Sequence, residues 1–224
     1  MNQILFDRLW FEKLWYNIPN DSLDILYKYK NYVITDIWLV KQPLSQVTEF
    51  IVNIITLWNM NKVTKNKEIK LHHIFIFIKL TNGNDNIYLK YDKQEQIYLT
   101  KFTSFPFSSD NILKIPYKGN YNLYTLIKKH IIYMGGHYFE YNMSFNNCRH
   151  FSIKFLNIIN VVPDLFIDFI KLEIEATNYI QDILGDNVII TNNLASGLYN
   201  IYMFIKKISQ IKTDKETKFV YFKT

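Results

Sequence analysis

The sequence predicts an α+β fold in which a small antiparallel sheet packs against helices. Residues 70–102 contain three β-rich segments, and residues 120–134 and 148–159 carry apolar side chains at helical spacing. Hydrophobic residues make up 49% of the 224-residue chain, which is enough to bury a core. We therefore expect a single domain over residues 1–224, with its core at about 33–160.

The N-terminal part is expected to be helical up to the first strand. Residues 1–30 show helical spacing interrupted by Pro19, and Asp21 and Ser22 could cap a second short helix that reaches Tyr29. We interpret residues 1–30 as a helical extension of the core. Residues 32–40 are β-branched and aromatic, which is typical of a strand, with Asp36 as a polar residue inside it.

A helix and a three-stranded meander should follow. Residues 45–60 have the i, i+3, i+4, i+7 apolar pattern of a buried helix face. Residues 70–80, 87–91 and 96–102 then read as strands. Asn82-Gly83 tolerates the positive φ that hairpin turns require, so the first two strands should be antiparallel neighbours.

The second half of the chain is predicted to be mostly helical. The helix at residues 120–134 should end at Gly135, where glycine can take a left-handed conformation. A second should begin at about Cys148 and end before Pro163. We assign residues 164–224 to a C-terminal helical extension, with helices at 164–184 and 198–211 and a short strand near 219–222.

Composition excludes several classes of protein. One cysteine cannot form an internal disulfide, which favours a cytoplasmic location. The N-terminus mixes charged residues among apolar ones, unlike a signal peptide, and the longest apolar windows fall short of the ~20 residues of a membrane-spanning helix. The net charge is +6, but the lysines are scattered, so no specific nucleic-acid partner is expected.

No cofactor and no metal ion are expected, because neither CxxC nor HExxH spacing occurs. The cysteine itself is the candidate for chemistry. Cys148 is expected in the first turn of a helix, where unpaired N–H groups and the helix dipole favour the thiolate. The backbone amides of the same turn could also hold an oxyanion. The remaining requirement is a base, and histidine is the usual one.

Five histidines are available as that base: His72, His73, His130, His137 and His150. His150 lies in the same turn as the thiol and should point away from it, which favours a structural hydrogen bond. His130 lies in a helix beside lysines, whereas His137 lies in a loop and stays open. His72 and His73 begin the meander, and because neighbouring strand residues face opposite ways, only one can face the site. We favour His73.

Residues 141–152, YNMSFNNCRHFS, resemble the nucleophile segment of the permuted papain-like (NlpC-like) proteins. The nearest families are the lecithin:retinol acyltransferase-like enzymes and the PPPDE thiol peptidases, and the match covers Tyr141, Asn147, Cys148, His150 and Phe151. In these families a histidine begins an upstream strand, a glycine-containing turn follows, and the cysteine lies downstream on a helix. HHIFIFIKLTNGN has that order. The resemblance spans roughly residues 71–159 and implies a permuted papain-like fold.

The resemblance also implies roles for individual residues. Cys148 would be the nucleophile, His73 the base, and a polar residue on the next strand would orient the imidazole. Tyr88 or Asn86 could hydrogen-bond the ring there, whereas Lys90 would repel an imidazolium. Asp36 is a substitute only if its strand lies beside His73.

Two functional hypotheses follow. The first is a hydrolase or acyltransferase that works through a thioester on Cys148 and acts on a lipid ester or amide, or on a peptide or isopeptide bond. The second is a catalytically degenerate member of the same fold that serves as a binding or decoy module. The apolar residues 165–172 with nearby lysines could form a patch for peripheral membrane contact if they are exposed. The oligomeric state is left open.

Overall fold

The computed structural model describes residues 18–43, 72–94, 96–108, 111–141, 146–161 and 166–170. The chain divides into two compact units, one made of residues 1–43 and 70–178 and the other of residues 44–69 and 179–224. Every described residue belongs to the first unit, so the single domain over 1–224 stays a prediction. The helices expected at 45–60 and 198–211, and the strand near 219–222, lie outside the described residues.

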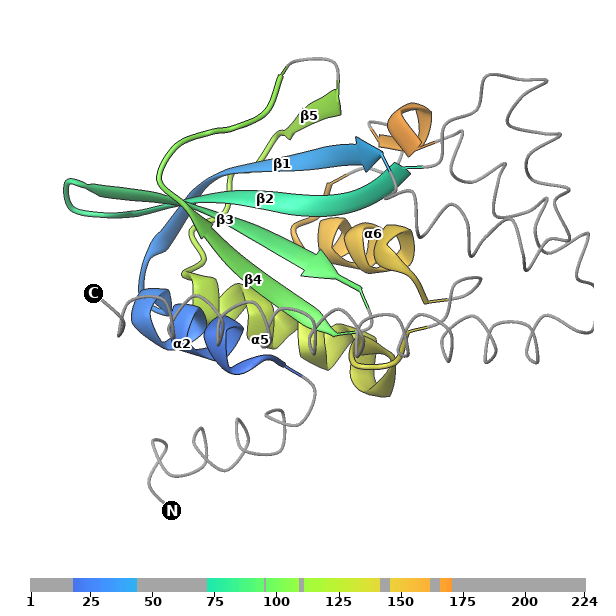
Figure 1. Ribbon diagram of the computed structural model, residues 1–224, viewed down its shortest axis with the longest axis horizontal. Helices are drawn as coiled ribbons and strands as arrows, with labels where there is room; N and C mark the ends of the chain where they lie inside the picture. Colours follow the sequence, from blue (N-terminus) through green and yellow to red (C-terminus); the bar gives the residue numbers. More distant parts are fainter. Residues whose placement is uncertain are drawn as a thin grey trace, which may run out of the picture. The chain divides into compact units, whose positions relative to one another are not determined.

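A five-stranded antiparallel sheet forms the centre of the first unit, in the order β4-β3-β2-β1-β5 (Figure 1). The strands are β1 (Val33–Pro43), β2 (His72–Asn82), β3 (Asp85–Lys93), β4 (Ile97–Phe102) and β5 (Ile112–Ile115). The predicted meander is confirmed as β2, β3 and β4, and the predicted strand at 32–40 is β1. The short strand β5, which pairs with β1, was not predicted.

The turn between β2 and β3 fixes their register. Gly83 takes φ +59, the left-handed conformation that the Asn-Gly pair predicts, and Asn82 pairs with Asp85 across the turn. From there the pairing continues without a shift to Ile76 opposite Tyr91. The start of β2 and the end of β3 therefore lie side by side at the far end of the hairpin.

The described helices are α2 (Asn20–Tyr29), α5 (Leu123–Met134), the 3₁₀-helix η3 (Gly135–Tyr138) and α6 (Cys148–Ile158), and residues 166–170 are also helical. The predicted start of α6 at the cysteine and the predicted end of α5 at Gly135, φ +58, are both confirmed. The predicted cap of α2 is wrong, because Pro19 occupies the N-cap position. Ser22 is buried instead, and its hydroxyl accepts a hydrogen bond of 2.9 Å from the Leu99 amide of β4.

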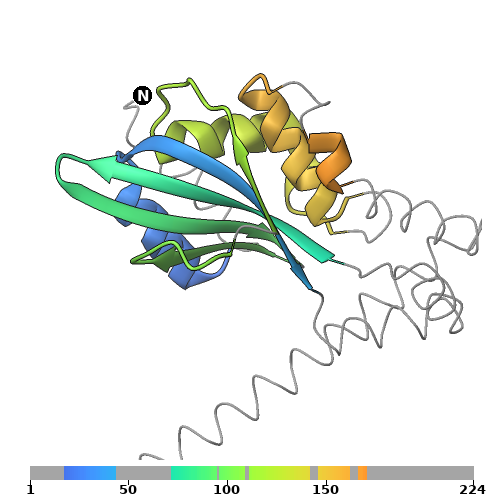
Figure 2. The same cartoon turned by 90° about the horizontal axis from the view of Figure 1, so that it is seen from above.

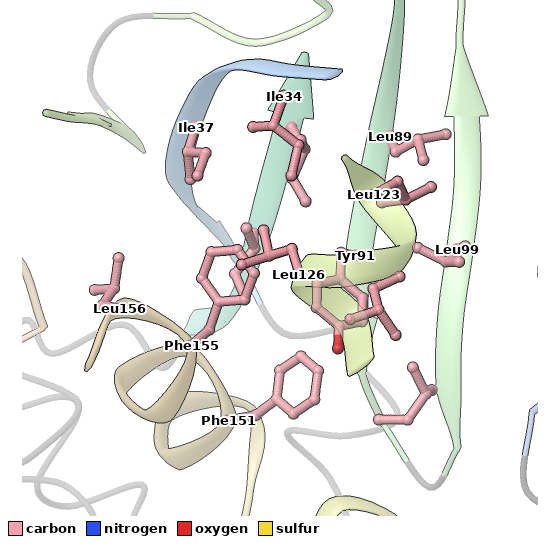
Figure 3. Packing of buried hydrophobic residues seen from close by; sticks show 14 of the residues in the cluster. Ile34, Ile37, Leu89, Tyr91, Leu99, Leu123, Leu126, Phe151, Phe155 and Leu156 are labelled. Atoms are coloured by element: carbon pink, nitrogen blue, oxygen red, sulfur yellow. The ribbon is translucent and has the colours of Figure 1, made fainter. Parts of the chain in front are cut away.

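One face of the sheet carries the main core. Helices α5 and α6 lie on the same side of the sheet (Figure 2), and α2 packs against β4 and α5. Alternate strand residues point into this core, as the period of two requires. Figure 3 shows Phe151 and Phe155 of α6 near Tyr91 of β3, and their ring centroids lie 4.9 and 5.8 Å from that of Tyr91. These contacts hold α6 against the end of β3.

The opposite face of the sheet carries a second, aromatic cluster. We call it the aromatic face, and it consists of Val40, Phe75 and Phe77 with Trp38, Tyr88, Phe102, Phe105 and Phe107 packed around them. Tyr88 stacks on Phe77 with the ring centroids 5.8 Å apart. The same strand alternation places His73 of β2 and Asp92 of β3 on this face, beyond Phe75 toward the end of the sheet.

Residues 166–170 are the described part of the predicted apolar patch after α6, and most of their apolar side chains are not exposed. Phe166 and Ile170 belong to the buried core, and Phe169 is partly buried with the Lys41 ammonium 4.4 Å from its ring centroid. Among residues 166–170, Ile167 is the exposed apolar side chain. The described helices include none with the length and apolar character needed to cross a bilayer.

Candidate active site

Three elements bring Cys148, His73 and Asp92 together at one end of the sheet. Cys148 is the first residue of α6, His73 the second of β2, and Asp92 the last but one of β3. Helix α6 packs against both strands. The Ile74 amide, next to His73, donates a hydrogen bond to the Cys148 sulfur, so the sulfur lies directly beside the beginning of β2. Cys148 as a whole residue is partly exposed.

The imidazole of His73 lies between the thiol and the carboxylate. Its Nε2 is 2.5 Å from Oδ1 of Asp92, and it also forms a hydrogen bond with Cys148. Because Nε2 is engaged by the carboxylate, Nδ1 is the nitrogen that serves the sulfur. The Asp92 side chain is only 1% exposed and that of His73 18%, so this row of groups is largely shielded from water.

The charges of these three groups support one another. Burial raises the pKa of the Cys148 thiol, but the neighbouring His73 and the Ile74 amide outweigh burial and lower it below the ordinary value. Burial likewise lowers the pKa of His73, but Cys148 and Asp92 together raise it to about 10. Over the intervening pH range the favoured state is a thiolate beside an imidazolium, which is the reactive form of a catalytic cysteine.

The second carboxylate oxygen of Asp92, Oδ2, also has polar partners. The Lys90 ammonium and the Gln94 side-chain amide each lie 2.9 Å from Oδ2. Burial raises the pKa of Asp92, but His73, Lys90 and Gln94 together lower it to about 2. The expected repulsion between Lys90 and the imidazolium is thus replaced by an ion pair between Lys90 and the carboxylate that orients the ring.

The asparagine before the cysteine caps α6. Asn147 has extended backbone angles, φ −100 and ψ −173, and its Oδ1 accepts hydrogen bonds from the amides of Arg149 at 3.0 Å and His150 at 3.2 Å. The Phe151 amide donates to the Asn147 carbonyl at 3.0 Å. The N–H of Cys148, at the first helical position, belongs to the amides for which helix geometry supplies no acceptor within the helix.

A buried lysine and a second asparagine fix the start of α6 to β3. The Lys93 ammonium donates to the carbonyls of His137 and Tyr138 at 2.7 and 3.0 Å and to the Asn146 side chain at 3.3 Å. Asn146 in turn donates to the carbonyls of His137 and Glu140, both at 2.6 Å. Burial lowers the pKa of Lys93 to about 8. Lys93 follows Asp92 directly, so the same strand end positions the carboxylate and the cysteine helix.

The remaining histidines have other partners. The Nδ1–H of His150 donates to Asn147 at 3.1 Å, its Nε2 accepts from Arg149 at 3.2 Å, and burial lowers its pKa to about 4, so it is a neutral structural group. His130 is buried in the core with Nδ1 2.9 Å from the Tyr91 hydroxyl. His137 is exposed and pairs with Glu140 at 3.0 Å.

The predicted orienting residues lie elsewhere. Tyr88 packs on the aromatic face and Asn86 bonds to the Asn84 carbonyl near the turn. Strand β1 does lie beside β2, but Asp36 is paired with Lys79 and forms an ion pair of 2.8 Å with Lys114. The orienting position is taken by Asp92, a residue outside the predicted candidates. Of the adjacent histidines, His73 contacts the thiol and His72 precedes it opposite Pro43.

Within the described ranges, no group of three or more His, Cys, Asp and Glu side chains is arranged to hold a metal ion. At the candidate site the carboxylate is already shared among His73, Lys90 and Gln94. An ammonium 2.9 Å from the same oxygen opposes binding of a second cation there. The arrangement fits acid–base and nucleophilic chemistry by the chain's own side chains.

Removing the cap tests how α6 presents the cysteine. Asn147→Ala is expected to lower the free energy of unfolding by about 1 kcal/mol, because two amides lose their acceptor, and also to slow alkylation of Cys148. Urea denaturation and iodoacetamide kinetics measure the two effects. Asn122→Ala is the matched control, because Asn122 caps α5 through the Thr125 amide and should change stability alone. Equal alkylation rates in both variants would contradict a role for the cap at the thiol.

Comparisons with known proteins assign the chain to no family. No family model matches the sequence, and no solved structure matches it significantly. A Borreliella burgdorferi protein whose name calls it an ankyrin repeat protein is 34% identical over 133 residues, which are 54% of this chain and 31% of the relative. The chain therefore spans less than a third of that relative's length.

Proposed function

We propose that the protein is a thiol-dependent hydrolase or acyltransferase of the permuted papain-like type. Cys148 is the nucleophile, His73 the general acid and base, and Asp92 the group that orients and charges the imidazole. The observation that supports this is the row Asp92, His73, Cys148, in which a nearly fully buried carboxylate holds one ring nitrogen and the thiol lies at the other. The second unit and any partner are outside this proposal.

The first half of the reaction forms a thioester. The Cys148 thiolate attacks the carbonyl carbon of an ester or amide, the new C–S bond forms, and the carbonyl electron pair moves to oxygen. The Cys148 N–H donates to this oxyanion. As the intermediate collapses, the C–O or C–N bond breaks and His73 gives its Nδ1 proton to the leaving alcohol or amine.

The second half releases the acyl group. His73, now neutral, takes a proton from water or from an acceptor hydroxyl or amine, whose oxygen or nitrogen attacks the thioester. The C–S bond breaks and Cys148 leaves as the thiolate beside an imidazolium. Water as acceptor gives a hydrolase and another nucleophile gives an acyltransferase. Lipid acyl groups and peptide or isopeptide carbonyls both suit these steps. Phe166 and Ile170 are buried in the core, so these two residues are not available for a membrane-facing patch.

The pH dependence of alkylation tests the ionised thiol directly. An ordinary thiol with pKa about 8.5 loses about 75-fold in thiolate between pH 8 and pH 6. The lowered pKa of Cys148 predicts a clearly smaller fall over the same range. Because Cys148 is the single cysteine, the rate of iodoacetamide incorporation by intact mass reports this group alone.

The urea-unfolded chain is the control for that measurement and should show the steep, ordinary profile. A steep profile in the folded protein would refute the proposed nucleophile. Acyl transfer is tested by mixing the protein with short and long p-nitrophenyl esters and with a peptide thioester, and then looking for a mass increase on Cys148. A flat alkylation profile with no acyl adduct and no turnover from any donor would favour the degenerate binding module.

A further inference from the structure

Lys90 takes part in the candidate site without touching the ring or the sulfur. Resting on the proposed function, we infer that Lys90 is a positioning residue: its ammonium keeps the Asp92 carboxylate charged and turned so that Oδ1 faces Nε2 of His73. The inference adds a fourth charged group to the site and assigns it to a strand position that precedes Asp92 by two residues.

The count of buried charges supports the inference. In its reactive form the site holds a thiolate, an imidazolium and a carboxylate, which sum to one negative charge in a shielded place. Lys90 adds a positive charge 2.9 Å from Oδ2 and makes the set neutral. Uncompensated buried charge is costly, so without the ammonium the site would tend to regain neutrality by taking up a proton. A proton taken up by Cys148 or Asp92 would remove the reactive form.

The geometry fixes which oxygen meets which partner. Lys90 and Asp92 lie on the same face of β3, since they are two residues apart on a strand. The Lys90 ammonium also lies 4.3 Å from the centroid of the buried Phe75 ring, and this cation–π contact holds it beside the carboxylate. Its side chain is only 18% exposed. With Oδ2 held by Lys90 and Gln94, the carboxylate cannot turn away from His73.

The described groups around Asp92 come from several elements and are consistent with this role of Lys90. His73 approaches from β2, Lys90 and Gln94 from β3 and the residue after it, and the Tyr98 phenol stands at the paired position on β4. Cys148 of α6 lies beyond His73. Lys90 is the lysine among these groups, and its ammonium lies 2.9 Å from Oδ2 of Asp92.

Lys90→Met tests the inference, because methionine keeps an apolar stem over Phe75 and removes the charge. We expect the acid limb of the Cys148 alkylation profile to move to higher pH, with a rate at pH 5 about threefold or more below that of the native chain. The sign follows from the loss of a cation: the pKa values of both Asp92 and Cys148 rise. Lys90→Arg should restore the native profile.

The chain offers a matched control in Lys114→Met. Lys114 also forms an ion pair with an aspartate, Asp36 at 2.8 Å, and its ammonium also lies over an aromatic ring, Trp38 at 5.8 Å, but at β5 away from the site. Lys114→Met should therefore leave the alkylation profile of Cys148 unchanged. A native profile in Lys90→Met would overturn the role of Lys90 while leaving the proposed function intact. If the native chain itself gives the profile of an ordinary thiol, the proposed function fails first.

Discussion

Replacing Cys148 with alanine is expected to abolish both turnover and labelling by iodoacetamide. The chain has no second cysteine, and the sulfur is the atom that the helix start, the Ile74 amide and the imidazole of His73 all serve. The oxyanion donor and the imidazole remain in the variant, but neither can form the acyl intermediate. Turnover is measured with the ester that gives the largest mass increase on the native protein. Labelling is measured by intact mass.

A second variant keeps this result interpretable if the thiol is needed for packing. His73→Gln retains the sulfur but removes the base, so labelling persists at pH 8.5 and falls steeply at pH 6, whereas turnover falls by about 10² to 10⁴. Urea denaturation of both variants checks that the fold survives. Ester turnover that persists in a folded Cys148→Ala protein would sink the nucleophile assignment, because some other group would then be attacking the carbonyl.

The sequence predicts the elements that have strong local signals. The meander follows from period-two alternation and one Asn-Gly turn. Gly135 marks the end of α5, and Asn147 marks the start of α6. The strand β5 has only four residues in a stretch between two prolines, too short to show a period, and it exists because β1 has a free edge to pair with.

The position of Asp92 beside His73 could have been predicted from the sequence. The polar residues of this strand named in the prediction, Asn86, Tyr88 and Lys90, lie opposite Thr81, Lys79 and Phe77, nearer the turn than His73. The Asn-Gly turn sets the hairpin register, and continuing that pairing beyond Ile76 and Tyr91 places residue 94 opposite His73 and Asp92 diagonally beside it. Both Gln94 and Asp92 are part of the site.

Other parts of the site have no local signal. Lys93 is nearly fully buried, and its partners are the carbonyls of His137 and Tyr138, far along the chain. A lysine at the end of a strand reads as a solvated charge, because lysine is seldom buried. Only the packing of η3 and α6 against the end of β3 shows that this lysine binds carbonyls and so fixes the cysteine helix.

On the proposed function, Asp92→Asn should lower kcat about 10²-fold with a smaller change in KM. The amide can still meet Nε2 of His73, but it carries no charge, so the imidazolium is less stable and the pKa of Cys148 rises toward its ordinary value. The acid limb of the alkylation profile therefore moves to higher pH.

The pKa of Asp92 is lowered to about 2 in the fold, so its contribution to stability is present above about pH 4 and is lost as pH falls toward 2.

Asp36→Asn separates catalysis from stability in that experiment. Asp36 also has a lysine partner, Lys114 at 2.8 Å, and its variant should affect unfolding in urea while turnover and the alkylation profile stay native. If Asp92→Asn behaves in the same way, the carboxylate is part of the scaffold and the imidazole is oriented without it. If only Asp92→Asn loses turnover and shifts the profile, the charge at Asp92 is what keeps the thiolate and the imidazolium together, since the two substitutions make the same chemical change.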